Sequence, residues 1–234
     1  MNAIIRFFKS SIGKKWVVAL TGIVLIAYVI GHLLGNLQIF IGANQPGDKQ
    51  INAYAHFLHS MGPILYVIRA FLIACIGLHI VTTIWLAREN RAARPQKYAV
   101  AKSRQASLAA KTMVFGGLTV LFFIVYHLLH FTMRKTLGFG PNGELPGMHG
   151  EYDCYNMVIL SFQSPLISFV YIVGLFMLCM HLSHGFQSLV QTLGLTSPKW
   201  VCTLEIGSRA LAWAIFAGYI SIPVASLLHF IKPV

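Results

Sequence analysis

Histidines deep inside the long apolar segments are the residues of this chain best suited to chemistry. Four segments each contain such a histidine. In the first two segments it is His32 and His79, whereas the third offers His127 or His130 and the fourth offers His181 or His184. An imidazole is costly in hydrocarbon unless it is paired or ligated, so an intramembrane ionisable residue is a candidate functional site. A lone histidine of this kind can equally well form a hydrogen bond between helices. One histidine in each of four helices favours ligation of a metal centre in a bundle core.

The composition places these segments in a membrane. The chain of 234 residues is 56% hydrophobic and 10% charged, with a mean hydropathy of +0.69, which leaves too little polar surface for a soluble domain. Five stretches reach the roughly 20 apolar residues that span a bilayer, namely 16–41, 62–87, 109–133, 162–193 and 206–231. The first is too long for a cleavable signal peptide. We therefore expect an all-α fold, a single five-helix transmembrane bundle covering residues 1–234.

The positive charges predict how this bundle is oriented. Lysine and arginine gather before the first helix and between the second and third: Arg6, Lys9, Lys14, Lys15, Arg88, Arg91, Arg94, Lys97, Lys102, Arg104 and Lys111. The remaining loops mix charges of both signs: Asp48, Lys49, Arg134, Lys135, Glu144, Glu151 and Asp153. Because cytoplasmic loops are enriched in lysine and arginine, we expect a cytoplasmic N-terminus and an outer C-terminus. The formal net charge of +12 is thus a topology signal and predicts no nucleic-acid partner. We expect the basic loop between the second and third helices to face lipid headgroups, an acidic soluble partner, or both.

The helical rise of about 1.5 Å per residue sorts the histidines by depth. His32 and His127 lie roughly 25 Å beyond the inner ends of their helices, in the outer half of the bilayer. The second and fourth helices run in the opposite direction, so His79 lies about 14 Å and His181 about 18 Å from the inner surface. The sequence therefore predicts an outer pair and an inner pair of histidines.

Two such pairs suit two haems held by side chains alone. Two imidazoles on opposite faces of one iron leave no open coordination position, which favours electron transfer over oxygen chemistry. Glycines near the histidines suit a flat porphyrin, although small residues are also common where transmembrane helices pack: Gly31, Gly35, Gly77 and Gly185. The cysteines form no CxxC or CxxCH motif, which argues against an iron–sulfur cluster and against covalently attached haem: Cys75, Cys154, Cys179 and Cys202.

Four runs around these histidines resemble the di-haem cytochrome b membrane subunit of bacterial succinate dehydrogenase and fumarate reductase: 31–37, 77–80, 126–131 and 181–188. The resemblance covers all five helices. In that family the ligand on the fourth helix stands four residues before a glycine, which selects His181 over His184. The ligand on the third helix opens an HLxxF-like run, which selects His127 over His130. The resemblance implies that His79 and His181 bind the inner haem iron and that His32 and His127 bind the outer one.

The same resemblance implies partners and a role in the respiratory chain. The partners are a flavoprotein with covalent FAD, where succinate and fumarate of the tricarboxylic acid cycle interconvert, and an iron–sulfur protein on the cytoplasmic face of the bacterial inner membrane. This chain itself supplies no catalytic residue to the dicarboxylate reaction and passes electrons to or from membrane quinone, menaquinone in the di-haem type. Some fumarate reductases have a glutamate two residues before the fourth-helix ligand, credited with proton movement. Cys179 stands there, so that proton route is not expected.

Other polar residues are candidates for supporting roles. Arg69 is the only arginine well inside a helix on the outer side, and a propionate of the outer haem is its expected partner. His130 and His184, about one turn beyond the expected ligands, are candidates for bonds to propionates or to protein carbonyls. Four polar residues near the outer ends of the first two helices either contact water or form the vicinity of a quinone headgroup: Asn36, Gln38, His56 and His59.

Two other classes of function compete with the respiratory anchor. The first is another bis-histidine, quinone-reactive cytochrome b, such as the anchor of a hydrogenase or formate dehydrogenase. The second is a haem-free transporter or structural anchor, but the helices lack the acidic relays and paired broken helices of transporters. The spacing of His181 and Gly185 favours the succinate dehydrogenase and fumarate reductase anchor.

Overall fold

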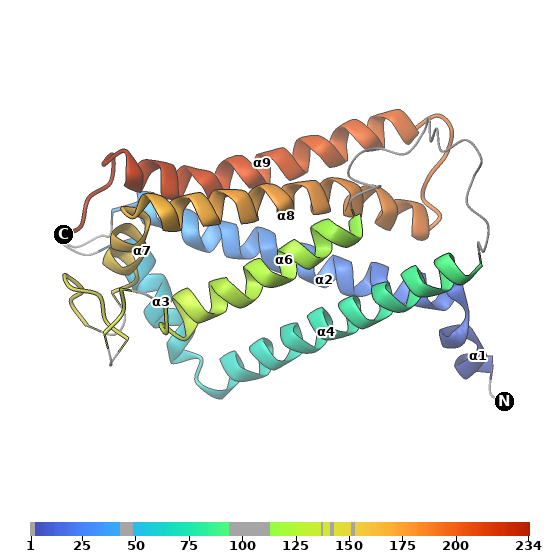
Figure 1. Cartoon of the computed structure of the whole chain (residues 1–234), viewed down its shortest axis with the longest axis horizontal. Helices are drawn as coiled ribbons and strands as arrows, with labels where there is room; N and C mark the ends of the chain where they lie inside the picture. The colour runs from blue at the N-terminus through green and yellow to red at the C-terminus, as the bar shows by residue number, and fades with distance from the viewer. Residues whose placement is uncertain (1–2, 43–48, 94–112, 137, 141–142, 151–152) are drawn as a thin grey trace.

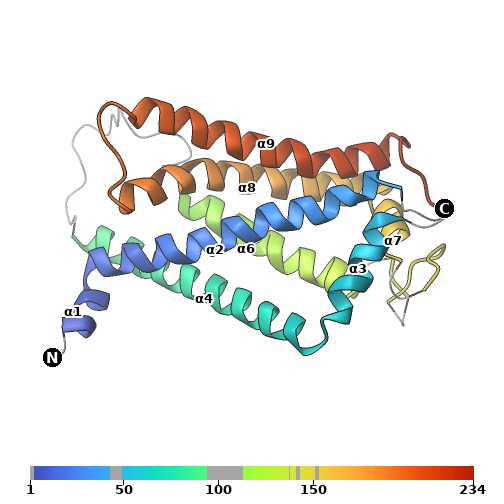
Figure 2. The same cartoon turned by 180° about the vertical axis from the view of Figure 1, so that it is seen from behind.

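The computed structural model describes residues 3–42, 49–93, 113–136, 138–140, 143–150 and 153–234. These residues form an all-α fold with five helical spans long and apolar enough to cross a membrane. The spans contain α2 (Ser11–Leu37), α4 (Pro63–Ala92), α6 (Met113–His127), α8 (Pro165–Thr192) and α9 (Val201–Leu227). Helix α6 reaches this length together with the helical turn that continues it, so the third span is Met113–Thr132. The helices run along the long axis of the molecule, and the two termini lie at opposite ends (Figures 1 and 2). The predicted all-α membrane bundle is confirmed.

Shorter helical elements lie at the ends of the bundle. Helix α1 (Ala3–Lys9) precedes α2 at the N-terminal end, whereas α3 (Gln50–Ser60) and α7 (Cys154–Phe162) lie at the end with the C-terminus (Figure 1). A 3₁₀ turn, η1, follows α2, and a π-helical turn, η2, continues α6; they span Gln38–Phe40 and Leu128–Thr132. The sequence analysis did not predict these elements, because a search for membrane-spanning apolar length does not detect short helices.

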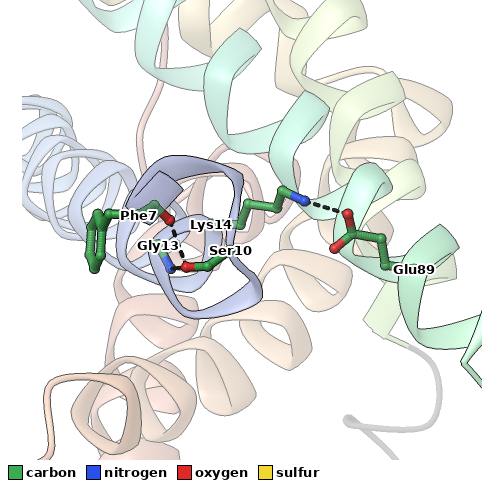
Figure 3. A network of polar contacts seen from close by, with 5 residues as sticks. All are labelled: Phe7, Ser10, Gly13, Lys14 and Glu89. Carbon is green, nitrogen blue, oxygen red and sulfur yellow. Dashed lines mark hydrogen bonds and ion pairs between the residues drawn. The ribbon is translucent and has the colours of Figure 1, made fainter. Parts of the chain in front are cut away.

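Local sequence signals begin the long helices. Ser10 caps α2, and its hydroxyl accepts a hydrogen bond of 3.0 Å from the backbone N–H of Gly13 (Figure 3). Pro63 and Pro165 occupy the first turns of α4 and α8, where the missing N–H has no intrahelical partner to lose. Gly62 precedes α4 with φ of 54°, a backbone conformation that glycine adopts without steric cost. The starts of α2, α4 and α8 are therefore encoded locally.

The helix boundaries differ from the predicted spans. Helix α2 begins at Ser11 and ends at Leu37, α4 continues to Ala92, and α9 occupies Val201–Leu227. Hydropathy marks only the part of a helix that crosses hydrocarbon, whereas the helix itself continues to its capping residues. Seven charged residues used to predict the orientation lie outside the described residues: Asp48, Arg94, Lys97, Lys102, Arg104, Lys111 and Glu151.

Glycines allow the long helices to approach one another closely. Helix α8 packs against α9 and α6, and α2 packs mainly against α4. A Cβ atom on Gly174 of α8 would lie 2.2 Å from Cδ2 of Phe123 on α6, and one on Gly35 of α2 would lie 2.6 Å from Cε1 of Tyr54 on α3. Small residues serve this purpose in membrane helices. Gly35 thus packs against α3, and its expected role beside a porphyrin stays a prediction.

Large apolar side chains cover the outside of the bundle. Exposures between 64 and 71% are found for Val67, Phe115, Phe122, Leu166 and Phe169. In α4, only Cys75 and Thr82 are buried. An apolar surface of this extent marks contact with lipid or with another protein subunit. The bundle is therefore suited to a bilayer.

Candidate functional site

His32 of α2 and His127 of α6 lie side by side, and both belong to the part of the bundle nearest the C-terminal end. Their ring centroids are 5.8 Å apart and their planes differ by 85°. Tyr28, one turn before His32, stacks on His32 at 5.4 Å with an interplanar angle of 12°. Tyr219 of α9 lies 6.2 Å from the same ring. Residues of α2, α6 and α9 thus meet at the outer pair.

His79 of α4 and His181 of α8 form a second pair, with ring centroids 6.5 Å apart. Glycines of the two other helices stand beside these imidazoles. A Cβ atom on Gly117 of α6 would lie 3.5 Å from Cε1 of His181, and one on Gly22 of α2 would lie 3.8 Å from Cε1 of His79. The inner pair therefore lies where α2, α4, α6 and α8 converge.

Helices α2 and α8 connect the two levels. The Thr21 hydroxyl lies 3.0 Å from Nδ1 of His79 and belongs to the same helix as His32, which gives an axial separation of about 16 Å between the pairs. The Tyr171 hydroxyl lies 3.4 Å from Nδ1 of His127 and shares α8 with His181, which gives about 15 Å. Two helices independently place the pairs at the same spacing. The pairing expected from depth is the pairing in the structure.

Several buried imidazole nitrogens in the described part of the chain have no hydrogen-bond partner: Nε2 of His130, Nδ1 of His181 and Nδ1 of His184. Buried polar atoms in native proteins are nearly always paired, so each unpaired one calls for an explanation. His130 is fully buried in the π turn η2, and its Nδ1 lies 2.9 Å from the Tyr171 hydroxyl. π turns are frequent at functional sites.

The residues present fit a haem in each pair. A ring nitrogen bound to a metal lies roughly 2.0–2.1 Å from it, so two imidazoles on opposite sides of one metal place their ring centroids about 6.4 Å apart. The inner pair, at 6.5 Å, matches this separation, and the outer pair, at 5.8 Å, is slightly closer. A Cβ atom on Gly185, one turn after His181, would meet no atom within 4 Å, so open space lies next to it, whereas Gly31 and Gly77 are exposed on the outside of the bundle. Within the described residues no three or more His, Cys, Asp or Glu side chains are placed to hold a metal ion, whereas a haem needs only two.

Arg69 differs from its expected environment. It is exposed on α4, and its guanidinium carbon lies 5.7 Å from the ring centroid of Tyr66, one turn earlier. The expectation that Arg69 is buried is wrong, because its long side chain extends along its own helix over an aromatic ring. Its pairing with a propionate stays a prediction.

The candidate quinone residues belong to the last turn of α2, to η1 and to α3, and α3 lies at the end of the bundle that carries the C-terminus (Figure 2). The Asn36 side chain donates a hydrogen bond of 2.7 Å to the carbonyl of His32, so its amide is engaged by its own helix. Gln38 begins η1 and is half-buried, while His56 and His59 are exposed on α3. Their contact with a quinone stays a prediction.

Sequence reasoning missed the two hydroxyl side chains at the imidazoles, Thr21 and Tyr171. Thr21 had a usable signal, since a residue three turns before His32 lies on the same helical face. Tyr171 had none, because its contact with α6 depends on how α6 and α8 pack. Cys179 is 2% exposed and packs in an apolar cluster with Leu33 and Ala212.

The structure thus shows a multi-pass helical membrane protein with two levels of facing histidines. Comparison of the chain with protein-family models, with curated proteins and with solved structures found no match.

Proposed function

We propose that this chain is the membrane-anchor and electron-transfer subunit of a succinate:quinone oxidoreductase, a succinate dehydrogenase or a quinol:fumarate reductase. One observation carries the proposal: four intramembrane histidines form two facing pairs, each joining two helices, at levels about 15 Å apart. The histidine and glycine runs that resemble the di-haem family add to it. Within the described residues, Nδ1 of His181 is buried without a hydrogen-bond partner, which a ligand role for His181 would explain.

In this proposal His79 and His181 hold the inner haem b, and His32 and His127 hold the outer one. Haem bound between two imidazoles supplies one-electron transfer, because no coordination position remains for a small ligand. The protein sets the distance between the two levels through α2 and α8. Helix α2 carries Thr21 at the inner level and His32 at the outer level. Helix α8 carries His181 at the inner level and Tyr171 at the outer level. Aromatic side chains such as Tyr28 and Tyr219 enclose the outer pair.

The remaining parts of the complex follow from the same proposal. A flavoprotein with covalent FAD interconverts succinate and fumarate, and an iron–sulfur subunit docks at the end with the N-terminus and with the basic residues Arg88 and Arg91. This chain passes electrons between that subunit and membrane quinone, menaquinone in the di-haem type. The cytoplasmic placement of this end and the bacterial inner membrane belong to the proposal.

The test is the haem content and the electron donor of the complex purified with its partner subunits. Pyridine haemochrome quantification should give two b haems per chain, and succinate should reduce at least one of them in a reduced-minus-oxidised spectrum. A complex without haem would contradict the ligand role of all four histidines. Haem that is reduced by hydrogen or formate but not by succinate would instead identify the anchor of a hydrogenase or formate dehydrogenase.

A further inference from the structure

Each histidine pair has a hydroxyl group bonded to one of its two imidazoles. Thr21 Oγ1 lies 3.0 Å from Nδ1 of His79 in the inner pair. The Tyr171 hydroxyl lies 3.4 Å from Nδ1 of His127 in the outer pair. In both pairs the contacted atom is Nδ1, so the nitrogen left for another partner is Nε2.

The direction of the hydrogen bond at His79 follows from the other bonds of Thr21. Its hydroxyl proton is directed to the backbone carbonyl of Val17, 2.7 Å away, or to that of Val18, 3.1 Å away. A hydroxyl has one proton and two acceptor lone pairs, so Thr21 Oγ1 is left as an acceptor toward His79. Nδ1 of His79 therefore carries the proton.

At the outer pair, Tyr171 has two imidazole neighbours and one proton to donate. Its hydroxyl lies 2.9 Å from Nδ1 of His130, the shorter contact, and 3.4 Å from Nδ1 of His127. When the proton goes to His130, the oxygen accepts from Nδ1–H of His127. His130 then holds the tyrosine proton in place and is itself fixed in the π turn η2.

We propose that Thr21 and Tyr171 are positioning residues that select the Nδ1–H tautomer of His79 and His127 and so present Nε2 of each as the ligand nitrogen. This inference rests on the proposed function. Metal-bound histidines usually donate their other ring N–H to a nearby acceptor, which orients the ring and raises the basicity of the ligand. The arrangement is reciprocal, because α2 orients an inner ligand while it carries an outer one, and α8 does the opposite. It also assigns His130 a role in orienting Tyr171, distinct from ligation.

The test compares the midpoint potentials of the two haems in Thr21→Val and Tyr171→Phe. Loss of the acceptor makes the imidazole less basic, which stabilises ferric iron less, so the potential of the affected haem should rise. Thr21→Val should shift only the inner haem and Tyr171→Phe only the outer one, each with about a 10- to 100-fold loss of affinity for that haem. Thr21→Ser keeps the acceptor and should restore the wild-type potential.

Matched controls remove a threonine and a tyrosine hydroxyl that bond only to the backbone. Thr83 donates to the carbonyl of His79 at 2.9 Å, and Tyr155 of α7 donates to the carbonyl of Lys232 at 3.1 Å. Thr83→Val and Tyr155→Phe should leave both potentials unchanged. Equal shifts in these controls, or unchanged potentials in Thr21→Val and Tyr171→Phe, would overturn the inference.

A second measurement needs no substitution and no haem. In haem-free protein labelled with ¹⁵N-histidine, magnetic resonance should show protonated Nδ1 and unprotonated Nε2 for His79 and His127. The opposite tautomer at both residues would overturn the inference even if the variants fail to insert. The two proposals fail differently: wild-type complex without haem contradicts the proposed function, whereas two haems with unchanged potentials in the variants contradict only the roles of Thr21 and Tyr171.

Discussion

Lys14 of α2 is 3% exposed, and its ammonium group forms an ion pair with the carboxylate of Glu89 on α4 (Figure 3). The same ammonium lies 4.1 Å from the ring centroid of Trp85, one turn before Glu89. Glu89 is less buried, with 37% of its side chain exposed. Since α4 packs mainly against α2, this contact joins the two helices at the end of the bundle that carries the N-terminus.

Glu89→Gln should destabilise the protein more than Lys14→Met. The first change leaves a buried ammonium without its carboxylate, which costs up to about 3 kcal/mol. The second leaves a carboxylate that water can still solvate, so its cost should be smaller. Thermal unfolding in detergent micelles of both single variants and of the double variant measures the difference. Glu205→Gln breaks the exposed pair with Arg209 within α9 and should cost about 0.5 kcal/mol or less; equal losses for Glu89→Gln and Lys14→Met would refute the prediction.

Asp153 joins several segments by hydrogen bonds at the opposite end of the bundle. Its carboxylate accepts hydrogen bonds from the backbone N–H groups of His149 and Asn156 and from the side chains of Asn156 and Asn52. Asn156 in turn bonds the backbone N–H and carbonyl of Val234, at the C-terminus, each at 3.0 Å. Burial acts to raise the pKa of Asp153, but these hydrogen bonds outweigh it and lower the pKa below its ordinary value of 3.8.

The stability of this end should therefore depend on pH. Because the pKa is lowered in the folded state, Asp153 contributes stability above about pH 4 that is lost as the pH falls through the folded pKa. At pH 7 the midpoint temperature of thermal unfolding should be higher for the wild-type protein than for Asp153→Asn. This difference should narrow toward pH 3. Glu144→Gln, an exposed acid of the same connection, serves as the control. A gap that stays constant with pH would contradict this assignment.

Gly174→Ala should destabilise the contact between α6 and α8. The new methyl group would lie 2.2 Å from Cδ2 and 2.5 Å from Cγ of Phe123, and overpacking of this kind typically costs about 1–3 kcal/mol. Phe123 contacts Tyr171 with ring centroids 5.4 Å apart, so the outer pair should also be disturbed. Gly207→Ala in α9 meets no atom within 4 Å and should be neutral or stabilising, because alanine favours helix. Thermal unfolding of both variants tests this, and equal destabilisation would show that the close approach is unimportant.

His32→Ala and His79→Ala should each remove one haem and leave the other. The pairs are separated by about 15 Å along the bundle, so loss of one ligand should not empty the other level. Haem quantification should fall from two to one per chain, and the remaining spectrum should differ between the two variants. His229→Asn, at an exposed histidine with φ of 57° beyond α9, should keep both haems. Loss of both haems from either ligand variant would argue for one shared site.

The sequence by itself determined the class of the fold and the axial order of the histidines. Apolar length identifies a membrane span without reference to any other segment. The helical rise then converts residue number into depth, which is why the helices that carry the partners of His32 and His79 follow from the sequence. The prediction of the helix ends is less accurate, because capping residues such as Ser10 lie beyond the apolar stretch.

Only the tertiary structure decided which faces of the helices meet. The bonds of Thr21 to His79 and of Tyr171 to His127 join residues 58 and 44 positions apart, and the fit of Gly174 against Phe123 depends on how closely α6 and α8 approach. The exposure of Arg69 and the burial of Lys14 likewise depend on neighbouring helices. Depth along a helix is a local quantity set by a constant rise, whereas the rotation of a helix about its axis and its distance from the next helix are set by the packing of all side chains between them.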